Sequence, residues 1–142
     1  MSDCVFCDMI SKKMHRDMLY EDGEVVAFLD IAPVNQGHLL VIPRTHYENI
    51  FDVPEETLQK IILVVKKMAQ VLDKISDGVN VVSNNKKAAG QVVGHLHFHV
   101  IPRMDGDGFR HWPGKEYESE EEMKKMTEEL KKIVSEVFTD SS

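Results

Sequence analysis

The stretch GHLHFHVIP, residues 94–102, constrains the fold more than any other part of the chain. Imidazoles and apolar side chains alternate along it, and successive side chains of a β-strand point to opposite faces of a sheet. Leu96, Phe98 and Val100 are therefore expected to face a core, and the strand is expected to end at Pro102. The other face then carries three imidazoles in one short run: His95, His97 and His99.

The rest of the chain supplies partners for this strand. The turn Asp22-Gly23 predicts a hairpin within residues 18–31. Apolar residues later recur at three- and four-residue steps, which predicts an amphipathic helix from near Pro54 to before Gly78. The other expected elements are a short helix over residues 4–13, strands over 38–43 and 79–84, and a last helix over 119–138 that begins with a Ser119–Glu122 capping box.

These elements predict an α+β fold. We expect about five strands in an antiparallel sheet, with the helices packed on one face: two main helices and a short N-terminal helix. The sequence contains no internal repeat and no stretch with the composition of a linker. Residues 1–142 are therefore expected to form a single domain, with residues 139–142 as a frayed tail.

The composition argues against several classes of function. Proteins that bind nucleic acids generally need a broad basic surface, whereas this chain of 142 residues has a net charge of −7. No nucleic-acid partner is therefore expected. No apolar run approaches the roughly 20 residues that span a bilayer, and the N-terminus lacks the basic and apolar parts of a secretory leader. The protein is therefore expected in the cytoplasm, with no membrane partner.

Three imidazoles on one face suit two kinds of chemistry. Histidines two residues apart on a strand can share a zinc ion. Alternatively, a neutral imidazole can attack phosphorus while its neighbours orient it and bind the phosphate oxygens. The second hypothesis is favoured by His38, which begins another predicted strand. It is also favoured by groups that suit a phosphate or a ribose: Asp30, Asn84, Gly90 and Gln91.

The segment GHLHFHV, residues 94–100, matches the His-φ-His-φ-His-φ-φ signature (φ apolar) that names the histidine triad family. The match extends to residues 20–50 and 84–103, so the chain from about residue 4 to about residue 113 resembles the family. This resemblance implies a nucleotide-binding, histidine-triad-like fold. It also implies a homodimer in which the two sheets continue into one larger sheet.

The resemblance implies roles for individual residues. His97 falls on the family's nucleophile, His99 on its phosphate-contacting histidine and His38 on its supporting histidine. The remaining matched positions are expected to bind a nucleotide: Phe6, Phe28, Leu29, Ile31 and Leu40 around the base and sugar, Asp30 at the ribose, and Asn84 and Gly90 at the phosphates.

The function implied is hydrolysis at the α-phosphate of a purine nucleotide conjugate, through a covalent nucleotidyl-histidine. Phosphoramidate-like conjugates of AMP or GMP are favoured because the chain continues into HWPG (111–114), which is similar to the phosphoramidase branch. Two alternatives stay open: a dinucleoside polyphosphate hydrolase, and a nucleotide-binding regulatory protein with little turnover. Val92 favours the second alternative, because the family commonly has a hydroxyl-bearing Ser or Thr after Gly-Gln. No organic cofactor is expected.

Cys4 and Cys7 form a C-x-x-C pair, which in a reducing compartment is a metal half-site or a redox pair. Zinc requires four ligands in a structural site. Some bacterial-type members that this chain resembles carry a structural zinc, and the resemblance implies that His46 and His95 complete the set. The cofactor expected is therefore one structural zinc ion.

Overall fold

A computed structural model describes residues 4–11 and 17–139. The chain divides into two compact units, Met1–Phe109 and Arg110–Ser142, each of which is described by itself. The first unit contains these elements: α1 (Val5–Ile10), β1 (Tyr20–Glu21), β2 (Val25–Leu29), β3 (Leu39–Pro43), α2 (Glu55–Asp73), β4 (Gly78–Val82), a 3-10 turn η1 (Lys87–Ala89) and β5 (Phe98–Arg103). The second contains α3 (Glu120–Thr139). The expectation of a single domain over the whole chain stays a prediction.

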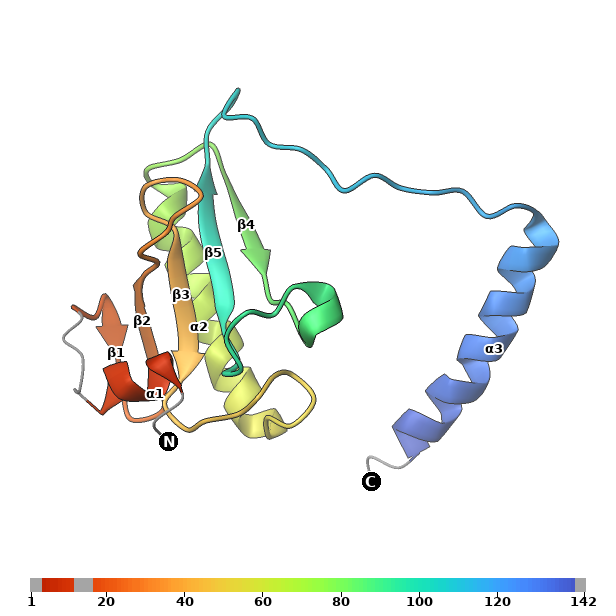
Figure 1. The fold of residues 1–142 in the computed structure, drawn as a ribbon, viewed down its shortest axis with the longest axis horizontal. Coiled ribbons are helices and arrows are strands. Elements are labelled where there is room, and N and C mark those ends of the chain that lie inside the picture. Colours follow the sequence, from red (N-terminus) through yellow and green to blue (C-terminus); the bar gives the residue numbers. More distant parts are fainter. Residues whose placement is uncertain (1–3, 12–16, 140–142) are drawn as a thin grey trace. The chain divides into compact units, whose positions relative to one another are not determined.

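The five strands form one antiparallel sheet in the order β1-β2-β3-β5-β4 (Figure 1). The predicted α+β fold with a five-stranded antiparallel sheet is therefore confirmed. The register sets Phe28 opposite Leu40 and Leu40 opposite His99, so these three side chains share one face of the sheet. That face carries the candidate site.

The other face of the sheet is covered by α2, which packs on β3, β4 and β5 (Figure 1). Pro54 is its N-cap residue, with extended backbone angles, and its missing N–H costs no helical hydrogen bond there. Every third or fourth residue of α2 is buried, as the sequence pattern predicts: Ile61, Val64, Val65, Met68 and Leu72. The main core lies between this stripe and the sheet.

The expectation that the helices pack on one face of the sheet is wrong. Phe6 and Met9 of α1 are buried in a second cluster with Phe28 and Leu40, on the face opposite α2. The physical reason is that β2 and β3 are apolar on both sides, with nine of their ten residues buried. Two apolar faces require two covers, and α1 supplies the second.

The predicted strand at 94–102 begins at Phe98 in the structure, four residues later than expected. The backbone N–H of Leu96 donates to the carbonyl of Tyr47 (2.7 Å), and Ser83 Oγ donates to the carbonyl of His97 (3.0 Å). This segment is therefore held by a loop and a side chain instead of a ladder. The predicted faces are still correct, because Leu96, Phe98 and Val100 all lie in the core beside α2.

The helix expected over residues 4–13 is present as α1, over Val5–Ile10. Residues 12 and 13 lie outside the described part of the chain, as do residues 140–142 of the expected tail. At the start of α3, the N–H of Glu122 donates to Ser119 Oγ (3.2 Å), as the capping box predicts. The Glu122 carboxylate accepts from the N–H of Glu118 (3.1 Å) instead of that of Ser119.

Across the described residues, none of the helices is both long enough and apolar enough to cross a membrane.

Candidate functional site

The structure separates the three triad histidines into two environments. His95 is fully buried and lies beside the thiols of Cys4 and Cys7. His97 and His99 instead line a cavity of about 480 Å³ on the α1 side of the sheet, with their ring centroids 5.0 Å apart. The ring of Phe6 lies between the two environments, 5.7 Å from that of His95 and 5.3 Å from that of His97.

Most of the residues predicted to bind a nucleotide line this cavity. They are Phe6, Phe28, Leu29, Asp30, Ile31, Leu40, Asn84 and Gly90. Ile31 and Leu29 are exposed at the rim, whereas Phe6, Phe28 and Leu40 are buried. An apolar hollow with a few polar groups at one end suits a planar base and a sugar in the hollow and a phosphate at the polar end.

His97 is held in one tautomer by the backbone. Its Nδ1–H donates to the carbonyl oxygen of His95 at 2.7 Å, because a carbonyl can only accept. A neutral His97 therefore carries no proton on Nε2, and the lone pair of that atom is available as a nucleophile.

His38 and His99 form a hydrogen-bonded pair beside His97. His38 Nδ1 accepts from the N–H of Val34 (3.0 Å), so the proton of neutral His38 lies on Nε2 and is donated to His99 Nδ1 at 3.0 Å. The second nitrogen of His99 then carries a proton that can be donated to a phosphate oxygen. Burial lowers the pKa of His38, and burial together with the neighbouring imidazoles of His97 and His38 lowers the pKa of His99 to about 4. Both rings are therefore neutral at pH 7.

The acidic and amide residues of the site have defined positions. Asp30 Oδ2 lies 3.5 Å from His38 Nε2, and Oδ1 accepts from the N–H of Ala32 (2.9 Å). Asp30, His38 and His99 lie close enough together to hold a metal ion. However, His38 Nε2 and His99 Nδ1 are already hydrogen-bonded to each other. Gly90 has a φ of +96°, which favours glycine, and the Asn84 amide lies next to it.

Gln91 was also expected at the phosphates, but it does not line the cavity. Its Nε2 donates to the carbonyls of Glu48 (2.6 Å) and Val93 (3.0 Å), and its Oε1 accepts from the N–H of Lys86 (2.8 Å). The amide is thus occupied in holding the loop that carries Asn84 and Gly90. A direct contact between Gln91 and a nucleotide stays a prediction.

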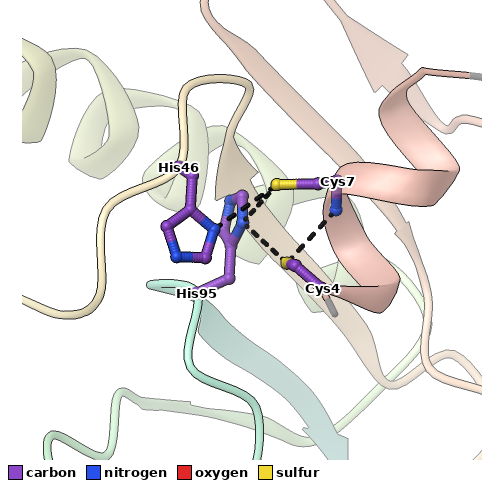
Figure 2. Close-up of side chains that lie close together, drawn as sticks. All are labelled: Cys4, Cys7, His46 and His95. Carbon is purple, nitrogen blue, oxygen red and sulfur yellow. Dashed lines mark hydrogen bonds between the residues drawn. The ribbon is translucent and has the colours of Figure 1, made fainter. Parts of the chain in front are cut away.

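The two cysteines, His46 and His95 form a four-donor cluster (Figure 2). His95 Nδ1 lies 3.4 Å from Cys4 Sγ and 3.6 Å from Cys7 Sγ, and His46 Nδ1 lies 3.4 Å from Cys7 Sγ. Ligand atoms around a tetrahedral zinc ion are separated by roughly 3.5 Å, so the donor set fits the metal in type, number and spacing. His95 Nε2–H donates to the carbonyl of Pro43 (2.9 Å), which leaves Nδ1 free to bind the ion.

The structure also bears on the alternative that the cysteines are a redox pair. Burial, followed by the hydrogen bond and charge of Cys4, raises the pKa of the Cys7 thiol to about 11. Redox-active thiols instead have a lowered pKa. The raised pKa of Cys7 therefore gives no support to the redox alternative.

Comparisons with known proteins agree with this geometry. The model of the HIT domain matches residues 11–106, which is more than half of the chain. The chain belongs to the histidine triad (HIT) family. A HIT-like protein of Methanocaldococcus jannaschii that is described as uncharacterised is 49% identical over 106 residues, covering 74% of this chain and 82% of the relative. An adenosine 5′-monophosphoramidase of Candida albicans is 35% identical over 145 residues, covering 96% and 94%.

Solved structures have the same fold. The structure of SMU.412c from Streptococcus mutans superposes with a TM-score of 0.86 at 32% identity, covering 94% of this chain and 87% of that one. A zinc-bound histidine triad protein from Mycobacterium smegmatis superposes with a TM-score of 0.72 at 39% identity, covering 80% and 85%.

Some residues of this HIT-family site were not predicted. The cavity is also lined by Val5, Met9, Ala32 and Val93. Val5 and Met9 are four residues apart in the predicted N-terminal helix, so their helical spacing was the signal that could have found them. Ser83, whose hydroxyl holds the carbonyl of His97, carries no comparable signal because its contact crosses between segments.

Proposed function

We propose that this HIT protein hydrolyses purine nucleotide conjugates at the α-phosphate, with phosphoramidate-like conjugates of AMP or GMP as the favoured class. The observation that supports it most directly is the hydrogen bond from His97 Nδ1 to the carbonyl of His95. This hydrogen bond keeps the proton on Nδ1, so the lone pair of Nε2 is available on a ring that lines the cavity. The resemblance to an adenosine 5′-monophosphoramidase over nearly the whole chain supports the same reaction class.

The proposed reaction has two displacement steps. His97 Nε2 forms a bond to the α-phosphorus while the bond from phosphorus to the conjugated group breaks, and that group leaves with the electron pair and takes up a proton. Water then attacks the phosphorus and gives up a proton, which replaces the one taken up by the leaving group, while the phosphorus–nitrogen bond breaks and its electron pair returns to His97. The balance is one conjugate and one water in, and one nucleoside monophosphate and one protonated leaving group out.

The neighbouring residues are proposed to assist by position and charge. Neutral His99 would donate its free ring N–H to a phosphate oxygen, and His38 would orient His99 through their 3.0 Å hydrogen bond. Asp30 would accept a ribose hydroxyl at the rim of the cavity. The base would lie among Phe6, Phe28, Leu29, Ile31 and Leu40.

The decisive experiment is mass spectrometry of the protein quenched at alkaline pH during turnover of adenosine 5′-phosphoramidate. We expect a nucleotidyl adduct on His97 and release of AMP into solution. His97→Asn should form no adduct and release no AMP, while it keeps its thermal midpoint and still binds AMP. Turnover by His97→Asn at the wild-type rate would overturn the proposal.

A second candidate function is a nucleotide-binding regulatory protein with little turnover. The observation that favours it is Val92, which is 93% exposed at the edge of the cavity and offers no hydrogen bond to a leaving group. Tight AMP binding with no turnover of any conjugate, dinucleoside polyphosphates included, would support this candidate over the hydrolase.

We also propose that the four-donor cluster holds one structural zinc ion. The support is the fit of two thiols and two imidazole Nδ1 atoms, and a zinc-bound HIT relative. Four protein ligands leave no open position for substrate, so the ion would stabilise the fold and take no part in the reaction. The homodimer and the cytoplasmic location stay predictions.

A further inference from the structure

A second hollow, of about 780 Å³, adjoins the cavity that His97 and His99 line, which is called the nucleotide cavity below. It is lined by Glu48, Asn49, Lys86, Lys87, Gly90, Gln91, Val92 and Gly94. Gly90 and Val92 line both hollows, so they form the wall at which the two meet. His97 lines only the nucleotide cavity.

The loop that carries the two lysines is held in an unfavourable backbone conformation. Lys86 has a φ of 74° and a ψ of 160°, a combination that is essentially confined to glycine. Hydrogen bonds keep it there. The N–H of Lys86 donates to Gln91 Oε1 (2.8 Å), and its carbonyl accepts from the N–H groups of Ala89 (3.1 Å) and Gln91 (3.2 Å). Such strain is kept mainly where a functional position requires it.

The lysines bring two positive charges to the hollow, against one negative charge from Glu48. Within the described part of the chain, neither ammonium group forms an ion pair with a carboxylate. Lys86 Nζ instead lies 4.8 Å from the centroid of the Phe51 ring, which is 71% exposed. The acidic member of the lining, Glu48, lies against Gly94, where its carboxylate would collide with any Cβ.

Two displacements at phosphorus require the leaving group to depart on the side away from the nucleophile. His97, Gly90 and Val92 line the same cavity, so a group displaced past Gly90 and Val92 would enter the second hollow. We propose that the second hollow receives the displaced group, and that Lys86 and Lys87 select displaced groups that carry negative charge. This inference rests on the proposed function and narrows its substrate class.

Two kinds of conjugate share that chemistry: amidates whose amine carries a carboxylate, and polyphosphates. The test compares kcat/KM for AMP release from three substrates. They are AMP joined through nitrogen to glutamate, AMP joined to the uncharged diamide of glutamate, and diadenosine tetraphosphate. We expect the glutamate conjugate to exceed its diamide by about tenfold, since an opposite charge within a few ångströms stabilises a bound anion. The polyphosphate arm tells whether the hollow takes a phosphate chain as well as a carboxylate.

Variants then assign the preference to the lysines. The double variant Lys86→Gln/Lys87→Gln should reduce the ratio of the glutamate conjugate to its diamide to about one. Lys86→Arg/Lys87→Arg should keep the ratio, because it keeps the charge. The matched control is Lys66→Gln/Lys67→Gln, an exposed adjacent pair on α2 that removes the same charge outside the loop, and its ratio should equal that of the wild type.

The outcomes separate this inference from the function on which it rests. If no conjugate yields AMP, the proposed function fails. If AMP is released from the charged and neutral conjugates with equal kcat/KM, the hydrolase stands and the charge selection is wrong. A ratio that falls equally in the control pair would also overturn it, because the effect would then come from net charge alone. If the glutamine double variant does not fold, Lys86→Gly, which suits the positive φ, provides the same loss of charge at one position.

Discussion

At the scale of single residues, Val92 lines both hollows, and its side chain offers no hydrogen bond to a substrate. We expect Val92→Ser to raise kcat/KM for an AMP amidate by about 10- to 100-fold, since a hydrogen bond to a charged group contributes about 1.5–3 kcal/mol. Val92→Ala is the control for space, because it removes more bulk than serine does and adds no hydroxyl, and it should give no gain. The measurement is initial-rate AMP release. An equal gain for alanine would show that space, and not the hydroxyl, limits the reaction.

The lowered pKa of His99 predicts how stability depends on pH. In the unfolded chain an imidazole takes up a proton near pH 6.5, whereas folded His99 stays neutral to about pH 4. Between these values the unfolded state binds more protons, so the free energy of unfolding falls as the pH falls. Because His99 is only half-buried, we expect a loss of about 1–2 kcal/mol by pH 4.

Denaturant unfolding of the wild type and His99→Asn at pH 7, 6, 5 and 4 checks this expectation. The variant should lose less stability over that range, because the titrating group is gone, and His38 should account for part of the remainder. A pH dependence identical to that of the wild type would place the titration elsewhere.

The sequence predicted the residues of the site better than their contacts. The alternation at 94–100 identified His97 and His99, and the resemblance supplied most of the cavity lining. Neither predicted that the Gln91 amide is used up by Glu48, Val93 and Lys86. Such contacts depend on how two loops pack against each other, and local sequence patterns do not predict that packing.

At the scale of elements, the turn before β3 decides where His38 lies. Gly37 has a φ of +100°, and a Cβ there would lie 3.4 Å from Pro102 Cγ. We expect Gly37→Ala to lower the free energy of unfolding by about 1–2 kcal/mol, because an L side chain is strained in this region. Gly23→Ala is the matched control: nothing lies within 4 Å of its Cβ position, and it should change stability by less than half as much. Denaturant unfolding of both variants measures the difference.

The same scale shows why element types were predicted more accurately than their limits. The period of α2 and the hairpin at Asp22-Gly23 are local, and both are present as expected. The start of β5 at Phe98 and the position of α1 opposite α2 are not local. The first depends on the Tyr47 carbonyl, and the second on the two apolar faces of β2 and β3, so both required the assembled sheet.

At the scale of the whole molecule, the four-donor cluster joins three distant segments: α1, the loop at His46 and the triad at His95. Removing zinc should therefore destabilise the fold, by about 3 kcal/mol or more for an ion present at a hundred times its Kd. Thermal unfolding with and without a chelator, together with metal analysis, tests this. Cys7→Ser should be insensitive to the chelator, and His99→Asn should respond like the wild type. Protein that contains no zinc and unfolds at the same temperature with chelator would refute the site.

The outer strands of the sheet are β1 and β4. In the described residues β4 pairs only with β5, and Val81 on it is 46% exposed, so its outer backbone groups are available to a second copy. The neighbouring helix α2 adds exposed apolar residues: Ile62, Leu63 and Val71. We expect a homodimer in which two β4 strands pair and continue the sheet. Val81→Lys should convert it to a monomer by light scattering, because a charge on an edge strand opposes pairing. Leu19→Lys, 53% exposed beside the opposite edge strand β1, is the matched control and should stay dimeric. If instead Leu19→Lys dissociates the protein and Val81→Lys does not, the copies join at the other edge, and the β4 assignment is wrong.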